Sequence, residues 1–158
     1  MSDHHARLRV RGPIPEQPEI DLPGRPLLPG KAAGPLLVFD RPISFWGGID
    51  PESGRVTDPR HPQHGLCISE QIIALPATIG SSSSSAILLE LIALKRAPAG
   101  IVLVESDAIL LLGALVGREL GHATPPALLL SSSAFGQLKT GLRAQVSVVL
   151  PDLSHTLV

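Results

Sequence analysis

The second half of the chain alternates between short apolar runs and segments with helical periodicity, and this alternation restricts the fold more than any other feature. Residues 86–96 carry isoleucine and leucine at helical spacing, with Glu90 and Lys95 among the polar positions. A second helical pattern, capped by Ser106 or Asp107, runs to residue 120 and stops at a glycine. Strands are predicted around these helices at 71–74, 101–105, 127–130 and 145–150. Because helices that separate strands imply parallel pairing through right-handed crossovers, we expect an α/β fold.

The first half of the chain predicts β structure and loops instead. Short apolar runs at 25–28 and 35–39 flank a glycine-containing turn and predict an early β-hairpin. Residues 42–62 are dense in glycine, proline and aspartate, which predicts a long loop of a kind that is uncommon without a function. Residues 1–20 are polar and contain prolines, so we expect a flexible N-terminal arm followed by one domain at 21–158.

The composition argues against several classes of protein. A net charge of -1 and an aromatic content of 3% disfavour nucleic-acid binding, which needs basic and stacking side chains. The single cysteine, Cys67, cannot hold an iron–sulfur cluster alone, and it suits a small buried hydrophobe in a reducing compartment. The most apolar run, 108–116, is too short to span a bilayer, and no signal-peptide stretch is evident. We therefore expect a cytoplasmic protein with neither a membrane nor a nucleic-acid partner.

A run of five serines follows Gly80, directly before the first predicted helix. Its composition alone is typical of a flexible linker, and serine also begins many helices purely as a cap. Its position between a strand and an amphipathic helix favours a turn that opens the helix. Unpaired backbone N–H groups and the positive end of the helix dipole would make that turn an anion site, where a serine hydroxyl loses its proton more easily.

The second candidate site is the string Ser-Phe-Trp-Gly-Gly-Ile-Asp-Pro at 44–51, which contains the chain's only tryptophan. Its two glycines permit close approach of the backbone to a ligand, so that Gly48 and Asp50 are candidate substrate contacts. An equally weighted alternative is a structural turn, in which Trp46 fills the core and Asp50 caps a backbone N–H group.

Two further polar segments are better explained as structure. Arg60 could pair with a carboxylate, and His61 and His64 could titrate near neutrality, but their spacing fits no common metal signature. An ordinary loop is therefore the favoured interpretation. The serines at 131–133 follow a predicted strand and could line a pocket, although a helix cap is favoured there.

Several of these segments together resemble the aconitase X swivel-domain family over roughly residues 25–150. The resemblance lies in 34–40, 42–51, 54–62, the glycine–serine turn at 80–85 and the Leu-Leu-Glu-Leu at 88–91. It implies an aconitase-like swivelling domain, layered β/β/α, that serves as the small subunit of a hydro-lyase. The large subunit would carry the iron or iron–sulfur site, so this chain alone would bind no metal or cofactor. The implied substrate is a small hydroxy acid: cis-3-hydroxy-L-proline, giving pyrroline-2-carboxylate, or alternatively mevalonate 5-phosphate.

The resemblance also implies roles for individual serines. Aconitase carries its base in a Gly-Ser-Ser-Arg motif, and placing that motif on residues 80–83 makes Ser81 the catalytic base and Ser82 and Ser83 substrate contacts. Ser83 stands where aconitase has an arginine, so a carboxylate-binding arginine would come from elsewhere. Two rival interpretations remain: a non-catalytic module that binds an anion or a partner, and an independent serine hydrolase, which the absence of a Gly-x-Ser-x-Gly elbow disfavours.

Overall fold

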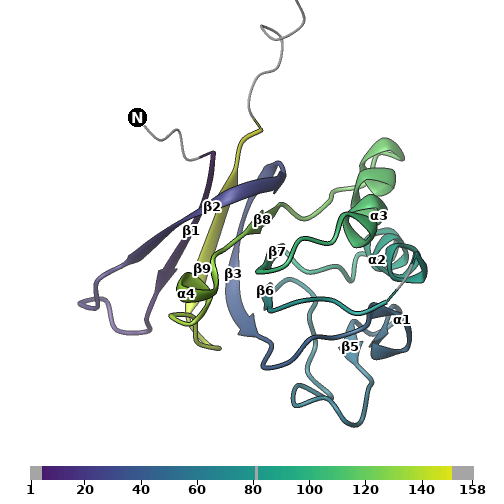
Figure 1. Ribbon diagram of the computed structural model, residues 1–158, viewed down its shortest axis with the longest axis horizontal. Coiled ribbons are helices and arrows are strands. Elements are labelled where there is room, and N and C mark those ends of the chain that lie inside the picture. Colours follow the sequence, from purple (N-terminus) through teal and green to yellow (C-terminus); the bar gives the residue numbers. More distant parts are fainter. Residues whose placement is uncertain (1–4, 81, 151–158) are drawn as a thin grey trace, which may run out of the picture.

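The computed structural model describes residues 5–80 and 82–150 of the chain (Figure 1). Within these residues, seven strands close into a barrel in the order β1-β2-β8-β7-β6-β3-β9, and β4 pairs with β5 in a separate small sheet. The strands are β1 (Ala6–Arg11), β2 (Ile20–Leu28), β3 (Gly30–Val38), β4 (Ile49–Asp50), β5 (Arg55–Val56), β6 (Ile72–Leu75), β7 (Gly100–Leu103), β8 (Ala127–Leu129) and β9 (Arg143–Val148). The helices are α1 (Phe45–Gly48), α2 (Ser83–Ala93), α3 (Ala108–Glu119) and α4 (Ser132–Phe135).

The predicted strand–helix alternation is confirmed in the second half of the chain. Strands β6, β7 and β8 pair in parallel, with α2 and α3 as the intervening crossovers, and β3 joins β6 as a fourth parallel strand. The cap predicted for the second helix is also confirmed, since Asp107 accepts a hydrogen bond of 3.0 Å from the backbone of Leu110. None of the helices that the structure describes has the length and apolar character needed to cross a membrane.

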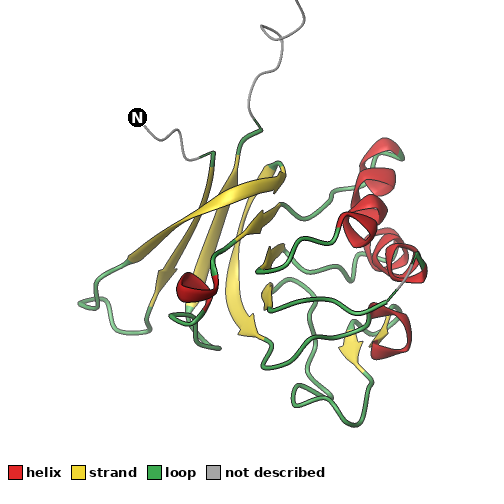
Figure 2. Cartoon of the chain, viewed as in Figure 1, coloured by secondary structure: helices red, strands yellow, loops and turns green. Residues whose placement is uncertain are grey.

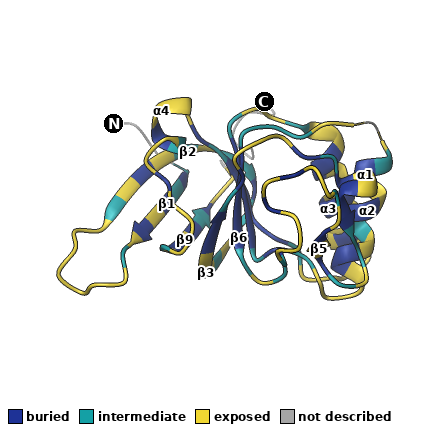
Figure 3. Cartoon of the chain, turned by 90° about the horizontal axis from the view of Figure 1, so that it is seen from below, coloured by how far each residue is buried: buried dark blue, intermediate teal, exposed yellow. Residues whose placement is uncertain are grey.

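Two hydrophobic cores give the molecule its β/β/α layers, as expected. One core fills the barrel and includes Leu8, Ile72 and Val146. The other lies between the parallel strands and the helices and includes Ile73 and Leu88. Figure 2 shows α1, α2 and α3 stacked on one side of the strands, and β6, between the two cores, is dark blue in Figure 3. Successive side chains of β6 alternate between the two cores because strand residues point to opposite faces.

The predicted N-terminal arm is wrong for residues 6–11, which form β1 in the barrel wall. Ala6, Leu8 and Val10 are buried inside the barrel, while the arginines between them face outward. This strand pairs with β2 on one side and with β9 on the other. Its period-two alternation supplies one wall of the core, and pairing on both edges fixes it in place.

The predicted early hairpin is also wrong, because β2 and β3 do not pair with each other. Strand β2 pairs with β1 and β8, whereas β3 pairs with β6 and β9. The two strands join different parts of the barrel after the turn at Pro29 and Gly30, where Gly30 has a φ of 140°. The final strand, β9, runs antiparallel to both β1 and β3 and closes the barrel.

Candidate functional site at the carboxyl ends of the parallel strands

The carboxyl ends of the four parallel strands bring several polar segments to one edge of the molecule. Ser44 belongs to the segment after β3, Thr78 to the segment after β6, Asp107 to the segment after β7, and Ser131 to the segment after β8. Two of these segments bond directly, since the Thr78 hydroxyl donates to the Asp107 carboxylate. In α/β folds with parallel strands this edge is the usual place for a ligand.

The serine run opens helix α2 at this edge. Gly80 has a φ of 128°, and Ser83 is the first residue of the helix. Ser81, the predicted base, lies outside the described residues. Ser82, which precedes the helix, is exposed. Its side chain makes no capping hydrogen bond to a described residue. The linker interpretation is therefore wrong for 83–85, because these residues form the beginning of a regular helix.

Gly80 allows two neighbouring hydroxyl groups to approach the serine turn closely. A Cβ atom at this position would lie 2.9 Å from Ser84 Oγ and 3.2 Å from Ser44 Oγ. The side chain of Ser84 is 2% exposed, and its Oγ has no hydrogen-bond partner among the described residues. Both the positive φ and the lack of space therefore favour glycine at this position.

The tryptophan-containing string lies beside the serine turn, because α1 packs against α2. Ile79 N donates to Ile43 O at 3.0 Å, which ties the segment before α1 to the segment before α2. The core position predicted for Trp46 as an alternative is wrong: Phe45 is fully buried, whereas Trp46 is 63% exposed. Gly48 is buried, and its carbonyl accepts from Thr57 N at 2.8 Å.

The carboxylate of Asp50 is bonded within its own turn. It accepts from Ser53 Oγ at 2.7 Å and from Glu52 N at 3.1 Å. The Ser53 hydroxyl and then the Glu52 N–H group lower the pKa of Asp50 below its ordinary value. These contacts match the turn-capping interpretation of Asp50, and contact with a substrate stays a prediction for both Asp50 and Gly48.

The histidine segment has a structural role, as favoured from the sequence. His61 is 7% exposed, its Nδ1 accepts from Gln63 N at 3.1 Å, and its Nε2 lies 3.2 Å from Arg41 O. Gln63 in turn bridges to both the backbone and the carboxylate of Asp40. This buried network anchors the loop between β5 and β6 to the end of β3, while His64 is exposed.

The group of serines after β8 acts as the predicted helix cap. Ser131 Oγ accepts from Ala134 N at 3.2 Å, which caps the short helix α4.

The hydrogen bond between Thr78 and Asp107 was not predicted from the sequence. The only signal for it was that each residue follows a predicted parallel strand. Such pairing depends on which strands are neighbours, and the residues themselves do not reveal it.

The donor set at this edge does not fit an iron site. The four side chains named above offer hydroxyl groups and the carboxylate of Asp107, which is already bonded to Thr78 and to the start of α3. In the part of the chain that the structure describes, no three histidine, cysteine, aspartate or glutamate side chains come close enough to hold a metal ion. Cys67 lies elsewhere, with its Sγ 3.6 Å from Ser53 O.

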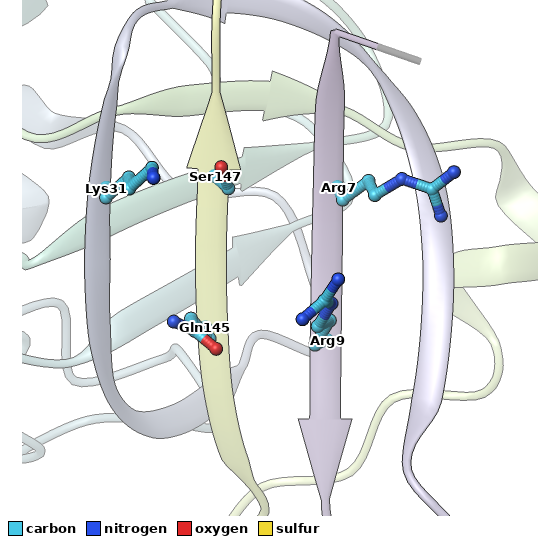
Figure 4. A pocket seen from close by; sticks show the side chains of 5 residues that line it. All are labelled: Arg7, Arg9, Lys31, Gln145 and Ser147. Carbon is cyan, nitrogen blue, oxygen red and sulfur yellow. The ribbon is translucent and has the colours of Figure 1, made fainter. Parts of the chain in front are cut away.

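A separate basic surface lies on the outer face of β1, β9 and β3. Arg7, Ser147 and Lys31 are level with one another across the three strands, and Arg9 and Gln145 form the next row (Figure 4). These side chains line a hollow of about 210 Å³. The hollow is distinct from the serine turn, which lies at the helical side of the molecule, and none of the predicted site residues that the structure describes lines it.

The comparison with known proteins agrees with the fold. The aconitase X swivel domain model matches residues 21–149. Cis-3-hydroxy-L-proline dehydratase from Pseudomonas aeruginosa is 47% identical over 66% of this chain, which spans only 18% of that protein. The phosphomevalonate dehydratase small subunit of Thermococcus gammatolerans is 35% identical, with 80% of this chain and 90% of that one covered.

A solved structure adds the three-dimensional likeness. The holo-form of aconitase X from Thermococcus kodakaraensis superposes with a TM-score of 0.68 and 30% sequence identity, over 80% of this chain and 96% of that one. The family model runs from β2 to the end of β9 and includes the helices, and the structural match covers 80% of this chain. The chain therefore belongs to the aconitase X swivel-domain family.

Proposed function

We propose that this chain is the small subunit of an aconitase X type dehydratase and supplies the serine base of an active site shared with a large subunit. The observation that carries the proposal is the serine turn: it opens an 11-residue helix at the carboxyl edge of the parallel strands, in a family whose relatives are named dehydratases. The large subunit would provide the iron site, because the hydroxyl-rich edge of this chain does not fit one. The cytoplasmic location stays a prediction.

The proposed reaction is the α,β-elimination of water from a small hydroxy acid. Ser81, as an alkoxide, takes the proton from the carbon next to the carboxylate and becomes a hydroxyl group. The β-carbon releases hydroxide as a double bond forms between the two carbons. The proton held by Ser81 then passes to this hydroxide, which completes the water molecule and restores the alkoxide. Backbone N–H groups at Ser82 and Ser83 would hold developing negative charge at the start of α2. The helix dipole contributes only about 0.3–1 kcal/mol to such an anion. Charges on the partner subunit must therefore supply most of the activation of Ser81.

The proposed substrate is cis-3-hydroxy-L-proline, which the 47% identity to the Pseudomonas aeruginosa enzyme favours. A different observation favours mevalonate 5-phosphate. The relatives named phosphomevalonate dehydratase small subunit are separate small chains, and this chain covers 90% of the one from Thermococcus gammatolerans. Gly48 and Asp50 are retained as proposed substrate contacts in either case.

The decisive experiment is anaerobic co-purification of this chain with a cysteine-bearing large subunit, followed by assays with each of the two substrates. We expect turnover that needs both chains and that Ser81→Ala reduces by at least about 100-fold, as for loss of a general base. Ser147→Ala, on the distant outer sheet, is the matched control and should keep full activity. Equal turnover by Ser81→Ala and the wild type would favour the non-catalytic binding module and refute the base assignment.

A further inference from the structure

Two large apolar side chains near the serine turn are exposed to solvent. Trp46 is 63% exposed and Ile79 is 57% exposed. They lie on neighbouring segments, because Ile79 N donates to Ile43 O and the Ser44 hydroxyl donates to Trp46 O, both at 3.0 Å. An exposed tryptophan next to a second exposed aliphatic side chain is typical of a surface that another protein covers.

The backbone holds Trp46 in a fixed outward position. Phe45, immediately before it, is fully buried in the helical core. Gly47, immediately after it, turns the chain with a φ of 75°, and its carbonyl accepts from Thr57 Oγ1 at 3.3 Å. The neighbouring Gly48 carbonyl accepts from Thr57 N at 2.8 Å. A side chain on such a frame loses little conformational freedom on binding, which is a property of interface anchors.

The position of these side chains favours one partner. We infer that Trp46 and Ile79 form a docking rim for the large subunit beside the serine turn. This inference rests on the proposed function: if the serine turn completes an active site with groups on another chain, that chain must approach this edge. The match to Pseudomonas aeruginosa cis-3-hydroxy-L-proline dehydratase spans 18% of that protein, so most of the relative's chain is available to cover the rim.

A second exposed apolar surface provides the matched control. Helix α3 exposes Leu112 at 52%. Leu112 is comparable in exposure to the rim residues, but it lies in the middle of a helix that follows β7. A purely hydrophobic attraction between subunits would use either surface, whereas the proposal requires the rim.

The test measures association and does not depend on turnover. This chain contains one tryptophan, so labelling it with 5-fluorotryptophan gives a single ¹⁹F resonance from Trp46. On addition of the unlabelled large subunit, we expect that resonance to shift and to lose its sensitivity to solvent. Calorimetric titration should show that Trp46→Ala raises the Kd about 30-fold or more, as expected for an interface hot spot. Ile79→Ser should raise the Kd by a smaller factor, and Leu112→Ala should leave it within threefold of the wild type.

Each outcome of this test decides either the proposed docking rim or the proposed serine base. An unchanged ¹⁹F resonance, a Kd for Trp46→Ala within threefold of the wild type, or a larger loss for Leu112→Ala would overturn the docking rim. Self-association of this chain that Trp46→Ala abolishes would also overturn it, because the occupant would then be a second copy. Ser81→Ala should bind as tightly as the wild type. If that variant binds and stays active while Trp46→Ala binds weakly, the rim stands and the serine base is refuted.

Discussion

Helices α2 and α3 approach each other closely at Gly113, and this contact links the stability of the fold to the position of the serine turn. A Cβ atom on Gly113 would lie 2.2 Å from Ser85 O and 3.0 Å from Ser85 C, both backbone atoms of α2. Such atoms cannot move aside alone, so Gly113→Ala must push the two helices apart. Because Ser85 lies in the first turn of α2, the displacement would reach the serine turn directly.

The expected size of the effect follows from two opposing contributions. Overpacking a close contact costs about 1–3 kcal/mol, and the backbone character of this contact places it at the upper end. The better helix propensity of alanine offsets this loss of stability by at most about 1 kcal/mol. We therefore expect Gly113→Ala to reduce the free energy of unfolding by about 1–2 kcal/mol. For a domain of this length, that corresponds to a fall in Tm of about 2–8 °C.

Gly117→Ala is the matched control, one helical turn further along α3. A Cβ atom there would meet only side chains, with the nearest, Ile92 Cγ2, at 3.2 Å. These side chains can shift, so the propensity gain should offset the contact and leave the stability within about 0.5 kcal/mol of the wild type. Urea unfolding of the three proteins, followed by circular dichroism, measures the difference. A Gly113→Ala protein as stable as Gly117→Ala would refute the close approach of the helices.

Two further predictions concern charged groups outside the helices. Arg143 lies directly opposite Arg11 in the β1–β9 pairing, so Arg143→Glu should replace a repulsion with an attraction and stabilise the fold by about 0.2–1 kcal/mol in low salt. Urea unfolding should show the gain shrinking in 0.5 M NaCl, and a salt-independent change would contradict its electrostatic origin. The lowered pKa of Asp50 means that its charged form contributes stability above the unfolded-state pKa, and that this contribution is lost as the pH falls through the lower folded-state pKa. Asp50→Asn should therefore lose stability less steeply than the wild type below about pH 4 in unfolding measurements, and parallel curves would argue against it.

The sequence predicted the helical side of this fold well because the relevant signals are local. Strands β6, β7 and β8 are continuous apolar runs, and α3 begins directly after Asp107, one of the two residues expected to cap it. Strand β1 was missed although Leu8 and Val10 alternate with arginines, since six residues with three positive charges also suit an exposed arm. The barrel order could not be predicted at all, because β1 and β9 lie at opposite ends of the chain and their pairing leaves no local pattern.

The candidate site was predictable as a set of segments but not as a set of contacts. The serine run and the tryptophan string were both identified, and the structure places them side by side through the packing of α1 on α2. The direction of single side chains was less predictable. In a tight turn, a shift of one residue exchanges the buried and exposed faces, which is why Phe45 fills the core and Trp46 does not. Asp50 acts as a turn cap because the Ser53 hydroxyl donates to its carboxylate. The sequence alone does not show that the turn brings these two side chains together.

The closure of the barrel by its first and last strands makes this domain a portable unit. Val149 N donates to His5 O at 2.7 Å, so the chain enters and leaves the fold at nearly the same point. A domain with adjacent entry and exit points can be joined to a larger protein, or inserted into one of its loops, through a short connection and without disturbing either fold. The same geometry should permit circular permutation, with a few residues linking Val149 to His5 and new ends opened in the loop between β1 and β2. Gene fusion and gene splitting are thus both easy for this architecture, which suits a family whose relatives include long single chains and separate small subunits.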